Sequence, residues 1–179
     1  MKIKCVVING AGGAGKDLFI EYCEAVLRHL SVACGNHSSV DPVKKAALLL
    51  GWDGVKDNKG RQFLSDLKAL GTSAYDGPAQ YMMGVIKEAE ELYCTDVVLF
   101  FHIREPREIE RFMEAVSGSI SVLVHRDGIE RFGNTSDRDV KEFPYTYHID
   151  NNRDKAFLHL QAINFVTDLM KHWTTSNSF

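Results

Sequence analysis

Residues 5–17 read CVVINGAGGAGKD, and the prediction of the fold depends on this stretch. It begins with a short apolar run rich in β-branched residues, which predicts a buried strand ending at Asn9. A glycine-rich segment follows, and the apolar residues after it recur at helical spacing, which predicts a helix over 16–30. A strand that leads through a glycine-rich turn into a helix N-terminus is the context of a phosphate-binding loop.

The spacing of Gly10, Gly15 and Lys16 is that of a P-loop, except that Asp17 stands where serine or threonine is expected. Backbone N–H groups in such a loop must approach phosphate oxygens closely, and larger side chains would block that approach. A glycine-rich turn with a chance lysine is the alternative. We predict that the phosphates of a nucleotide bind to residues Gly10, Ala11, Gly12, Gly13, Ala14, Gly15, Lys16 and Asp17.

The composition predicts one globular domain of ordinary size. The 179 residues are 45% hydrophobic and 25% charged, a balance that allows a sizeable core. The net charge of −3 gives no reason to expect a nucleic-acid polymer as partner. The four cysteines have no metal-type spacing, so we expect free thiols in a reducing compartment. We see no signal peptide or membrane-spanning segment and therefore expect a cytoplasmic protein.

Predicted strands and helices alternate along the rest of the chain. Apolar runs predict further strands over 31–34, 96–103, 120–125 and 145–149. Helical spacing predicts helices over 43–50, 61–68, 76–93, 107–116 and 156–173. This alternation predicts a single α/β domain, residues 1–179, with a mainly parallel sheet.

Local signals predict how some of these helices begin, end and pack. Asp41 is expected to cap the helix that follows it, and Gly71 and Thr72 are expected to end the helix over 61–68. Met82 and Met83 are expected to pack in the core rather than to line a binding groove.

At this point the chain resembles the P-loop kinases of the nucleoside-monophosphate kinase group. Within that group it is most similar to phage-type deoxynucleoside monophosphate kinases, and its loop is also similar to that of animal-type phosphomevalonate kinases. The resemblance covers most of the chain loosely. It rests on the segments Gly15-Lys16-Asp17, Lys59-Gly60-Arg61-Gln62-Phe63-Leu64, Leu70-Gly71-Thr72, Arg104-Glu105-Pro106-Arg107-Glu108 and His148-Ile149-Asp150-Asn151-Asn152.

The resemblance implies a three-layer P-loop kinase fold with a five-stranded parallel sheet. ATP would bind on the P-loop. A phosphorylated acceptor would bind over helices inserted at about 35–93, and a lid would close from about 126–142. These boundaries and roles are expectations from the resemblance.

Phosphoryl transfer needs alignment, exclusion of water and positive charge around the transferring group. Lys16 would bind the β- and γ-phosphates. The carboxylate of Asp17 would be a hard oxygen ligand for Mg²⁺, although it could instead only favour the helix N-terminus through the dipole. The resemblance implies an acidic residue at the end of the strand over 96–103, but His102 stands there. Histidine suits Mg²⁺ poorly, so Glu105 is the alternative ligand.

Other candidates concern the acceptor, the lid and the adenine. His102 either contacts the acceptor or is a histidine satisfied at a strand end. Arg104 and Arg61 are candidate phosphate clamps, with a salt bridge to Glu108 and simple surface exposure as their respective alternatives. Asn151 lies either in a loop near adenine or in a plain turn. The candidate lid arginines are Arg126, Arg131 and Arg138.

We therefore predict an ATP-dependent, Mg²⁺-assisted kinase that acts on a small phosphorylated acceptor, in first place a (deoxy)nucleoside monophosphate. A phosphomevalonate-type or other small-molecule kinase is one alternative. A nucleotide-binding protein without efficient transfer is another, favoured by the missing strand-end carboxylate. We expect neither a nucleic-acid polymer nor a membrane as partner, and a homodimer remains an open option.

Overall fold

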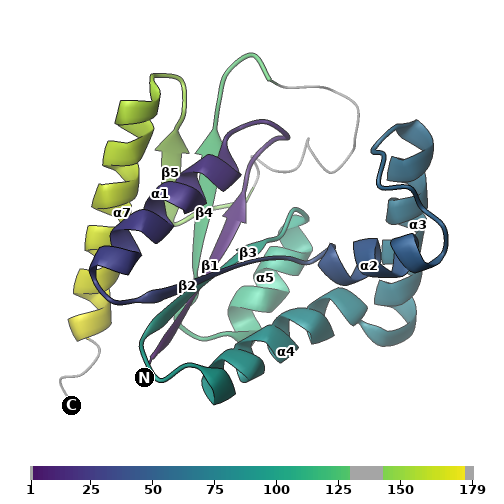
Figure 1. Ribbon diagram of the computed structural model, residues 1–179, viewed down its shortest axis with the longest axis horizontal. Coiled ribbons are helices and arrows are strands. Elements are labelled where there is room, and N and C mark those ends of the chain that lie inside the picture. The colour runs from purple at the N-terminus through teal and green to yellow at the C-terminus, as the bar shows by residue number, and fades with distance from the viewer. Residues whose placement is uncertain (1, 130–142, 176–179) are drawn as a thin grey trace. The chain divides into compact units, whose positions relative to one another are not determined.

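A five-stranded parallel sheet forms the centre of the computed structural model, which describes residues 2–129 and 143–175 (Figure 1). The strand order is β2-β3-β1-β4-β5, so β1 lies in the middle. The strands are β1 (Ile3–Asn9), β2 (Ala33–Ser38), β3 (Val97–His102), β4 (Ile120–His125) and β5 (Tyr147–Asp150). The predicted α/β class and the five-stranded sheet are confirmed.

Helices cover both faces of this sheet. The ring of Phe100 in β3 packs at a tilt against that of Phe165, whereas the ring of the next residue, Phe101, packs at a tilt against that of Phe112. Because successive strand residues point to opposite faces, the helices carrying Phe165 and Phe112 lie on opposite sides of the sheet. The helices are α1 (Lys16–His29), α2 (Asp41–Leu49), α3 (Asn58–Tyr75), α4 (Gly77–Leu92), α5 (Pro106–Ala115) and α7 (Lys155–Thr175).

The register of the central strands brings distant residues to one edge of the sheet. β1 pairs in parallel with β3, with Ile8 opposite His102, and it pairs on its other side with β4, with Asn9 opposite Leu123. The carboxyl ends of parallel strands meet at the same edge, where ligands of open α/β sheets bind. The P-loop segment leaves β1 at this edge.

The chain divides into two compact units. One contains residues 1–36 and 93–179, with β1, β3, β4, β5, most of β2, α1, α5 and α7, and the other contains residues 37–92, with the end of β2, α2, α3 and α4. In the first unit, α1 and α7 pack against each other, and their buried side chains join those of the strands in one apolar core.

Within residues 37–92, two predicted helix boundaries are wrong. α3 does not stop at Gly71 and Thr72 but continues to Tyr75 and ends at Asp76, which has φ 52°. A glycine inside a helix costs about 1 kcal/mol, and the packing of α3 against α2 and α4 offsets this local penalty. At its other end, α3 starts earlier than predicted because Asp57 accepts a hydrogen bond from the backbone N–H of Gly60 at 2.7 Å.

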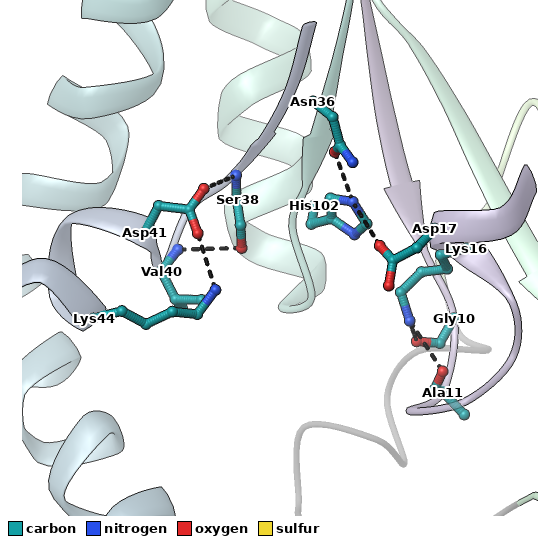
Figure 2. A network of polar contacts seen from close by, with 10 residues as sticks. All are labelled: Gly10, Ala11, Lys16, Asp17, Asn36, Ser38, Val40, Asp41, Lys44 and His102. Atoms are coloured by element: carbon teal, nitrogen blue, oxygen red, sulfur yellow. Dashed lines mark hydrogen bonds and ion pairs between the residues drawn. The ribbon is translucent and has the colours of Figure 1, made fainter. Parts of the chain in front are cut away.

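The predicted cap at Asp41 is also wrong, since α2 begins at Asp41 and Val40 is its N-cap. The Asp41 carboxylate instead accepts hydrogen bonds from the Ser38 backbone N–H at 2.7 Å and from Lys44 Nζ at 2.9 Å (Figure 2). The carboxylate thus ties α2 to the chain that leads into it.

β2 lies further along the chain than predicted. Ser31 has φ 58° and closes the end of α1 with a hydrogen bond from its N–H to the carbonyl of Arg28, so the strand begins only at Ala33. Pairing with β3 then carries the strand through the polar residues to Ser38. β2 is at the edge of the sheet, where one side of a strand has no neighbouring strand, and its polar sequence therefore lacked the apolar pattern that predicts a buried strand.

The side-chain predictions are confirmed in part. Met82 is buried in α4 as expected, but Met83 is exposed. All four cysteines are free, as predicted, and burial raises the pKa of Cys34 to about 12. None of the helices in residues 2–129 and 143–175 has the length and hydropathy needed to span a bilayer.

Phe165 tests the packing of the sheet-bearing unit. Its ring is 2% exposed and lies 5.6 Å from that of Phe19 in α1 and 5.1 Å from that of Tyr147 in β5, measured between ring centroids. Phe165→Ala should lower the free energy of unfolding by about 3–5 kcal/mol because it leaves a cavity. Urea unfolding measures this value.

Ile163→Ala is the matched control, because Ile163 lies on the same helix and is 38% exposed. It should change the free energy of unfolding by about 1 kcal/mol or less. Equal losses in the two variants would contradict the central packing role of Phe165.

Candidate functional site

The P-loop segment, residues 10–15, is confined by the ends of two other strands. Gly10 has φ 147°, and a Cβ atom there would overlap the backbone carbonyl of Val124 in β4. Gly15 has φ 95°, and a Cβ atom there would overlap the side-chain amide of Asn151. Both positions therefore require glycine for backbone conformation and for space.

Asn151 holds the far end of this segment. Its side chain is buried, and Nδ2 donates a hydrogen bond to the carbonyl of Ala14 at 2.8 Å. Its backbone N–H donates to the carbonyl of His125 at 2.8 Å, so the residue after β5 is also fixed to the end of β4. Asn151 thus connects the P-loop segment to the end of β4. A direct contact between Asn151 and adenine stays a prediction.

Lys16 is folded back over the loop. Its Nζ donates hydrogen bonds to the carbonyls of Gly10 at 2.6 Å and Ala11 at 3.0 Å (Figure 2). The ammonium group is therefore held at the mouth of the loop, next to the backbone that the sequence predicts to bind phosphate. Lys16 is the first residue of α1, where the positive end of the helix dipole lies.

Asn9 joins three segments at the carboxyl end of β1. It is almost fully buried, and its Oδ1 accepts a hydrogen bond from the N–H of Gly10 at 2.8 Å. Its Nδ2 donates to the carbonyl of Arg104 at 2.9 Å and to Tyr145 Oη at 2.8 Å. One amide therefore fixes the start of the P-loop segment, the chain after β3 and the chain before β5.

Sequence reasoning missed this role of Asn9 and Tyr145. The available signal was an amide at the end of an otherwise apolar strand, because a buried polar side chain must find hydrogen-bond partners. Its partners could not be named in advance, since they are 95 and 136 residues away along the chain.

Tyr145 is buried at this junction, and burial raises its pKa to about 12, although the hydrogen bond with Asn9 acts in the opposite direction. The phenol is therefore neutral at physiological pH.

The end of β3 brings His102 to Asp17. His102 Nε2 lies 2.9 Å from Asn36 Oδ1 in β2 and 3.7 Å from Asp17 Oδ1 at the start of α1 (Figure 2). The His102 side chain is 17% exposed and that of Asp17 is 91% exposed. The structure thus places the two residues that depart from the usual motif next to each other.

Arg104 and Glu105 follow β3 directly. Arg104 is exposed, and its backbone is fixed through the bond to Asn9. Glu105 is the half-buried N-cap residue of α5, and its carbonyl accepts hydrogen bonds from the N–H groups of Glu108 and Ile109. The phosphate role of Arg104 and the metal role of Glu105 stay predictions.

Arg61 belongs to the unit of residues 37–92. It is exposed, and its Nε donates a hydrogen bond to the carbonyl of Lys56 at 2.9 Å. The same unit contains a polar pair that the sequence did not suggest, with His37 Nδ1 3.5 Å from Tyr81 Oη. Burial lowers the pKa of His37, while the carboxylates of Asp41 and Glu88 act against this shift.

Of the candidate lid residues, only Arg126 lies within the described part of the chain, and Arg131 and Arg138 lie outside it. Arg126 is exposed in the turn after β4. This turn is tied to the chain after β5, because Asp127 N–H donates to Asn152 Oδ1 at 2.6 Å.

The donor set at this edge departs from that of a magnesium site. Mg²⁺ prefers oxygen ligands, and Asp17 supplies a carboxylate, but His102 supplies an imidazole nitrogen at the strand end. Within residues 2–129 and 143–175, no three His, Cys, Asp or Glu side chains form a group that could hold a metal ion by themselves.

Comparison with solved structures shows the P-loop kinase fold. The chain is similar to thymidylate kinase from Ehrlichia chaffeensis, with 14% identity, a TM-score of 0.55, and coverage of 93% of this chain and 100% of the other. It is similar to shikimate kinase from Aquifex aeolicus, with 12% identity, a TM-score of 0.50, and coverage of 93% and 98%. It is also similar to a gluconokinase from Sinorhizobium meliloti, with 15% identity, a TM-score of 0.50, and 98% coverage of both chains.

These likenesses concern the fold, because the identities are low. No protein-family model matches the chain, and no curated protein sequence matches it significantly.

Gly10 and Gly12 test the confinement of the P-loop segment. Gly10→Ala should lower the free energy of unfolding by about 2 kcal/mol or more, because alanine is strained at this φ and meets the Val124 carbonyl. Gly12→Ala is the control in the same loop, since a Cβ atom there has no neighbour within 4 Å, and it should change stability by about 1 kcal/mol or less. Chemical denaturation measures both, and equal effects would contradict the confinement.

Tyr145→Phe tests the buried junction through pH. At about pH 9 the variant should be less stable by about 1 kcal/mol, because it loses the bond with Asn9. The phenol pKa is higher in the folded protein than in the unfolded chain, so the wild type loses stability as pH rises from about 10 to about 12, and the variant lacks this loss. Urea unfolding at about pH 9 and about pH 11 measures the difference, which should shrink at the higher pH. A constant difference would contradict the raised pKa.

Proposed function

We propose that this protein transfers the γ-phosphoryl group of ATP to a small phosphorylated acceptor. The observation that carries the proposal is the P-loop segment, in which close neighbours require glycine at positions 10 and 15 and over which Lys16 is held. A loop of this form at the N-terminus of α1 offers backbone N–H groups and the positive helix end to an anion. The fold shared with solved kinases supports the same reading.

Lys16 would bind the β- and γ-phosphates. Its Nζ donates to the neutral carbonyls of Gly10 and Ala11, and a charged phosphate oxygen forms a stronger bond with an ammonium group. Nucleotide binding would therefore draw Nζ from the loop carbonyls to the phosphates. There it would stabilise the charge on the transferring group as the bond to the leaving ADP oxygen breaks and the bond to the acceptor oxygen forms.

Arginine side chains would bind the acceptor and the transferring group. Arg104 is exposed at the strand-end edge, and its backbone is fixed by Asn9. Arg61 from the unit of residues 37–92 is the second candidate, and Arg126 is a candidate for a lid role together with Arg131 and Arg138. A planar guanidinium suits phosphate because it donates two parallel hydrogen bonds.

The acceptor that we favour is a (deoxy)nucleoside monophosphate. This choice rests on the resemblance of Gly15-Lys16-Asp17 and the other segments to phage-type deoxynucleoside monophosphate kinases. Thymidylate kinase is one of the similar solved structures, but shikimate kinase and a gluconokinase share the fold as well, so the fold alone leaves the acceptor open. A phosphomevalonate-type acceptor is the alternative suggested by the loop.

The test is ATP with a divalent cation and a panel of acceptors, read out as ADP formation. The panel contains the deoxynucleoside and ribonucleoside monophosphates, phosphomevalonate, shikimate and gluconate. Turnover with a monophosphate supports the proposal, and turnover with phosphomevalonate alone selects the alternative. Tight ATP binding without any turnover would instead favour a nucleotide-binding protein, as the histidine at the end of β3 suggests.

Lys16→Ala should reduce the turnover of the best acceptor by at least about a hundredfold, because the transferring group loses its fixed positive charge. Lys171→Ala is the control, since Lys171 is an exposed lysine on α7 whose Nζ bonds Asp168 at 3.1 Å. Steady-state kinetics on both folded variants measures the effect. Equal turnover in Lys16→Ala and wild type would refute the role of Lys16.

A further inference from the structure

One buried chain of hydrogen bonds joins two segments that the proposed reaction would use. The Gly10 N–H donates to Asn9 Oδ1 at 2.8 Å, and Asn9 Nδ2 donates to the carbonyl of Arg104 at 2.9 Å. Gly10 begins the P-loop segment, and Arg104 carries the exposed guanidinium that we propose as a phosphate ligand. A single planar amide therefore connects the start of the loop to the backbone of the arginine.

The pairing of β1 with β3 does not reach as far as Arg104. Its last pair is Ile8 with His102, so the chain leaves the sheet before the arginine. Ile103 is fully buried on one side of Arg104, and Glu105 is the N-cap of α5 on the other. Between these two anchors, the Asn9 side chain ties the Arg104 carbonyl to the end of β1. The separation of Arg104 from the P-loop segment therefore depends on how the Asn9 amide is oriented.

Tyr145 fixes the orientation of this amide. Asn9 Nδ2 carries two hydrogens, and Tyr145 Oη accepts a hydrogen bond from it at 2.8 Å. Both side chains are buried, so bulk water does not replace this bond. The Tyr145 ring is itself held by T-shaped contacts with the rings of Phe143 and His148. Without the phenol oxygen, the amide would lose this acceptor and would favour a rotation towards another one.

Such a rotation would displace two segments at once, because the same amide bonds Gly10 and Arg104. We propose that Tyr145 is a positioning residue for phosphoryl transfer, which fixes the Asn9 amide and through it the place of Arg104 relative to the P-loop segment. The inference rests on the proposed function, since it concerns the alignment of the γ-phosphoryl group on the loop with an acceptor held at Arg104. A misplacement of about 1 Å can lower a rate by about a hundredfold.

Tyr145→Phe tests this role because it removes the phenol oxygen and leaves an aromatic ring in the same packing. The kcat with ATP and the best acceptor should fall by about tenfold. The KM values of ATP and of the acceptor should each change by less than about twofold, because each substrate keeps its own ligands. Steady-state kinetics measures all three, at a temperature at which circular dichroism shows the variant to be fully folded. Asn9→Ala removes the other end of the same bond and should lower kcat by at least as much.

Tyr147→Phe is the matched control, because it makes the same chemical change two residues further along. The Tyr147 ring also packs against the core, 5.1 Å from that of Phe165 between ring centroids. Its hydroxyl makes no hydrogen bond within residues 2–129 and 143–175. This variant should keep the kcat of the wild type.

Arg104→Ala separates a positioning role from a general loss of structure. In that background Tyr145→Phe should lower kcat by less than about twofold, because the guanidinium that it would misplace is already gone. A merely structural role would instead give the same factor in both backgrounds.

The wild type decides which proposal a negative result concerns. If the wild type turns over and Tyr145→Phe keeps its kcat, the inference is overturned and the proposed function stands. A raised KM with unchanged kcat, or an equal loss in Tyr147→Phe, would overturn the inference in the same way. If the wild type turns over none of the acceptors, the proposed function fails and the inference fails with it.

Discussion

The close approach of the P-loop segment to its neighbours is the constraint on which the site depends. The backbone at Gly10 lies against the Val124 carbonyl, and the backbone at Gly15 lies against the Asn151 amide. No side chain fits between these surfaces, so the loop follows the path that the ends of β4 and β5 leave open. The loop is therefore shaped before any ligand arrives, so the anion binding that we propose would cost little ordering entropy in its backbone.

The same edge of the sheet is held together by one buried amide. Asn9 ends the central strand and bonds the start of the loop, the carbonyl of Arg104 and the hydroxyl of Tyr145. The Asn9 side chain is almost fully buried, and leaving a buried polar group unsatisfied costs about 1–3 kcal/mol. Asn9 thus connects the P-loop segment to the backbone of Arg104, the exposed arginine that we propose as an acceptor ligand.

The two residues that depart from the usual P-loop kinase motif, Asp17 and His102, lie next to each other. An aspartate after the P-loop lysine and a histidine at the end of β3 would each be puzzling alone, because one adds negative charge and the other removes an oxygen ligand. The register of β1 with β3 places His102 beside Asp17, with 3.7 Å between Nε2 and Oδ1. The Asp17 carboxylate is of the kind that Mg²⁺ prefers, whereas the imidazole of His102 is not.

The sequence by itself determined the central strand, the P-loop segment, the helix after it and the parallel α/β class. These follow from hydrophobic spacing and from the steric needs of glycine, which act over a few residues. Only the tertiary structure decided the course of α3 through Gly71, the neighbours of His102, and the roles of Asn9 and Asn151. In α3, packing against α2 and α4 offsets the cost of a glycine inside the helix. In the others the partners lie 66 to 137 residues apart, and strand register, which no local pattern encodes, brings them together.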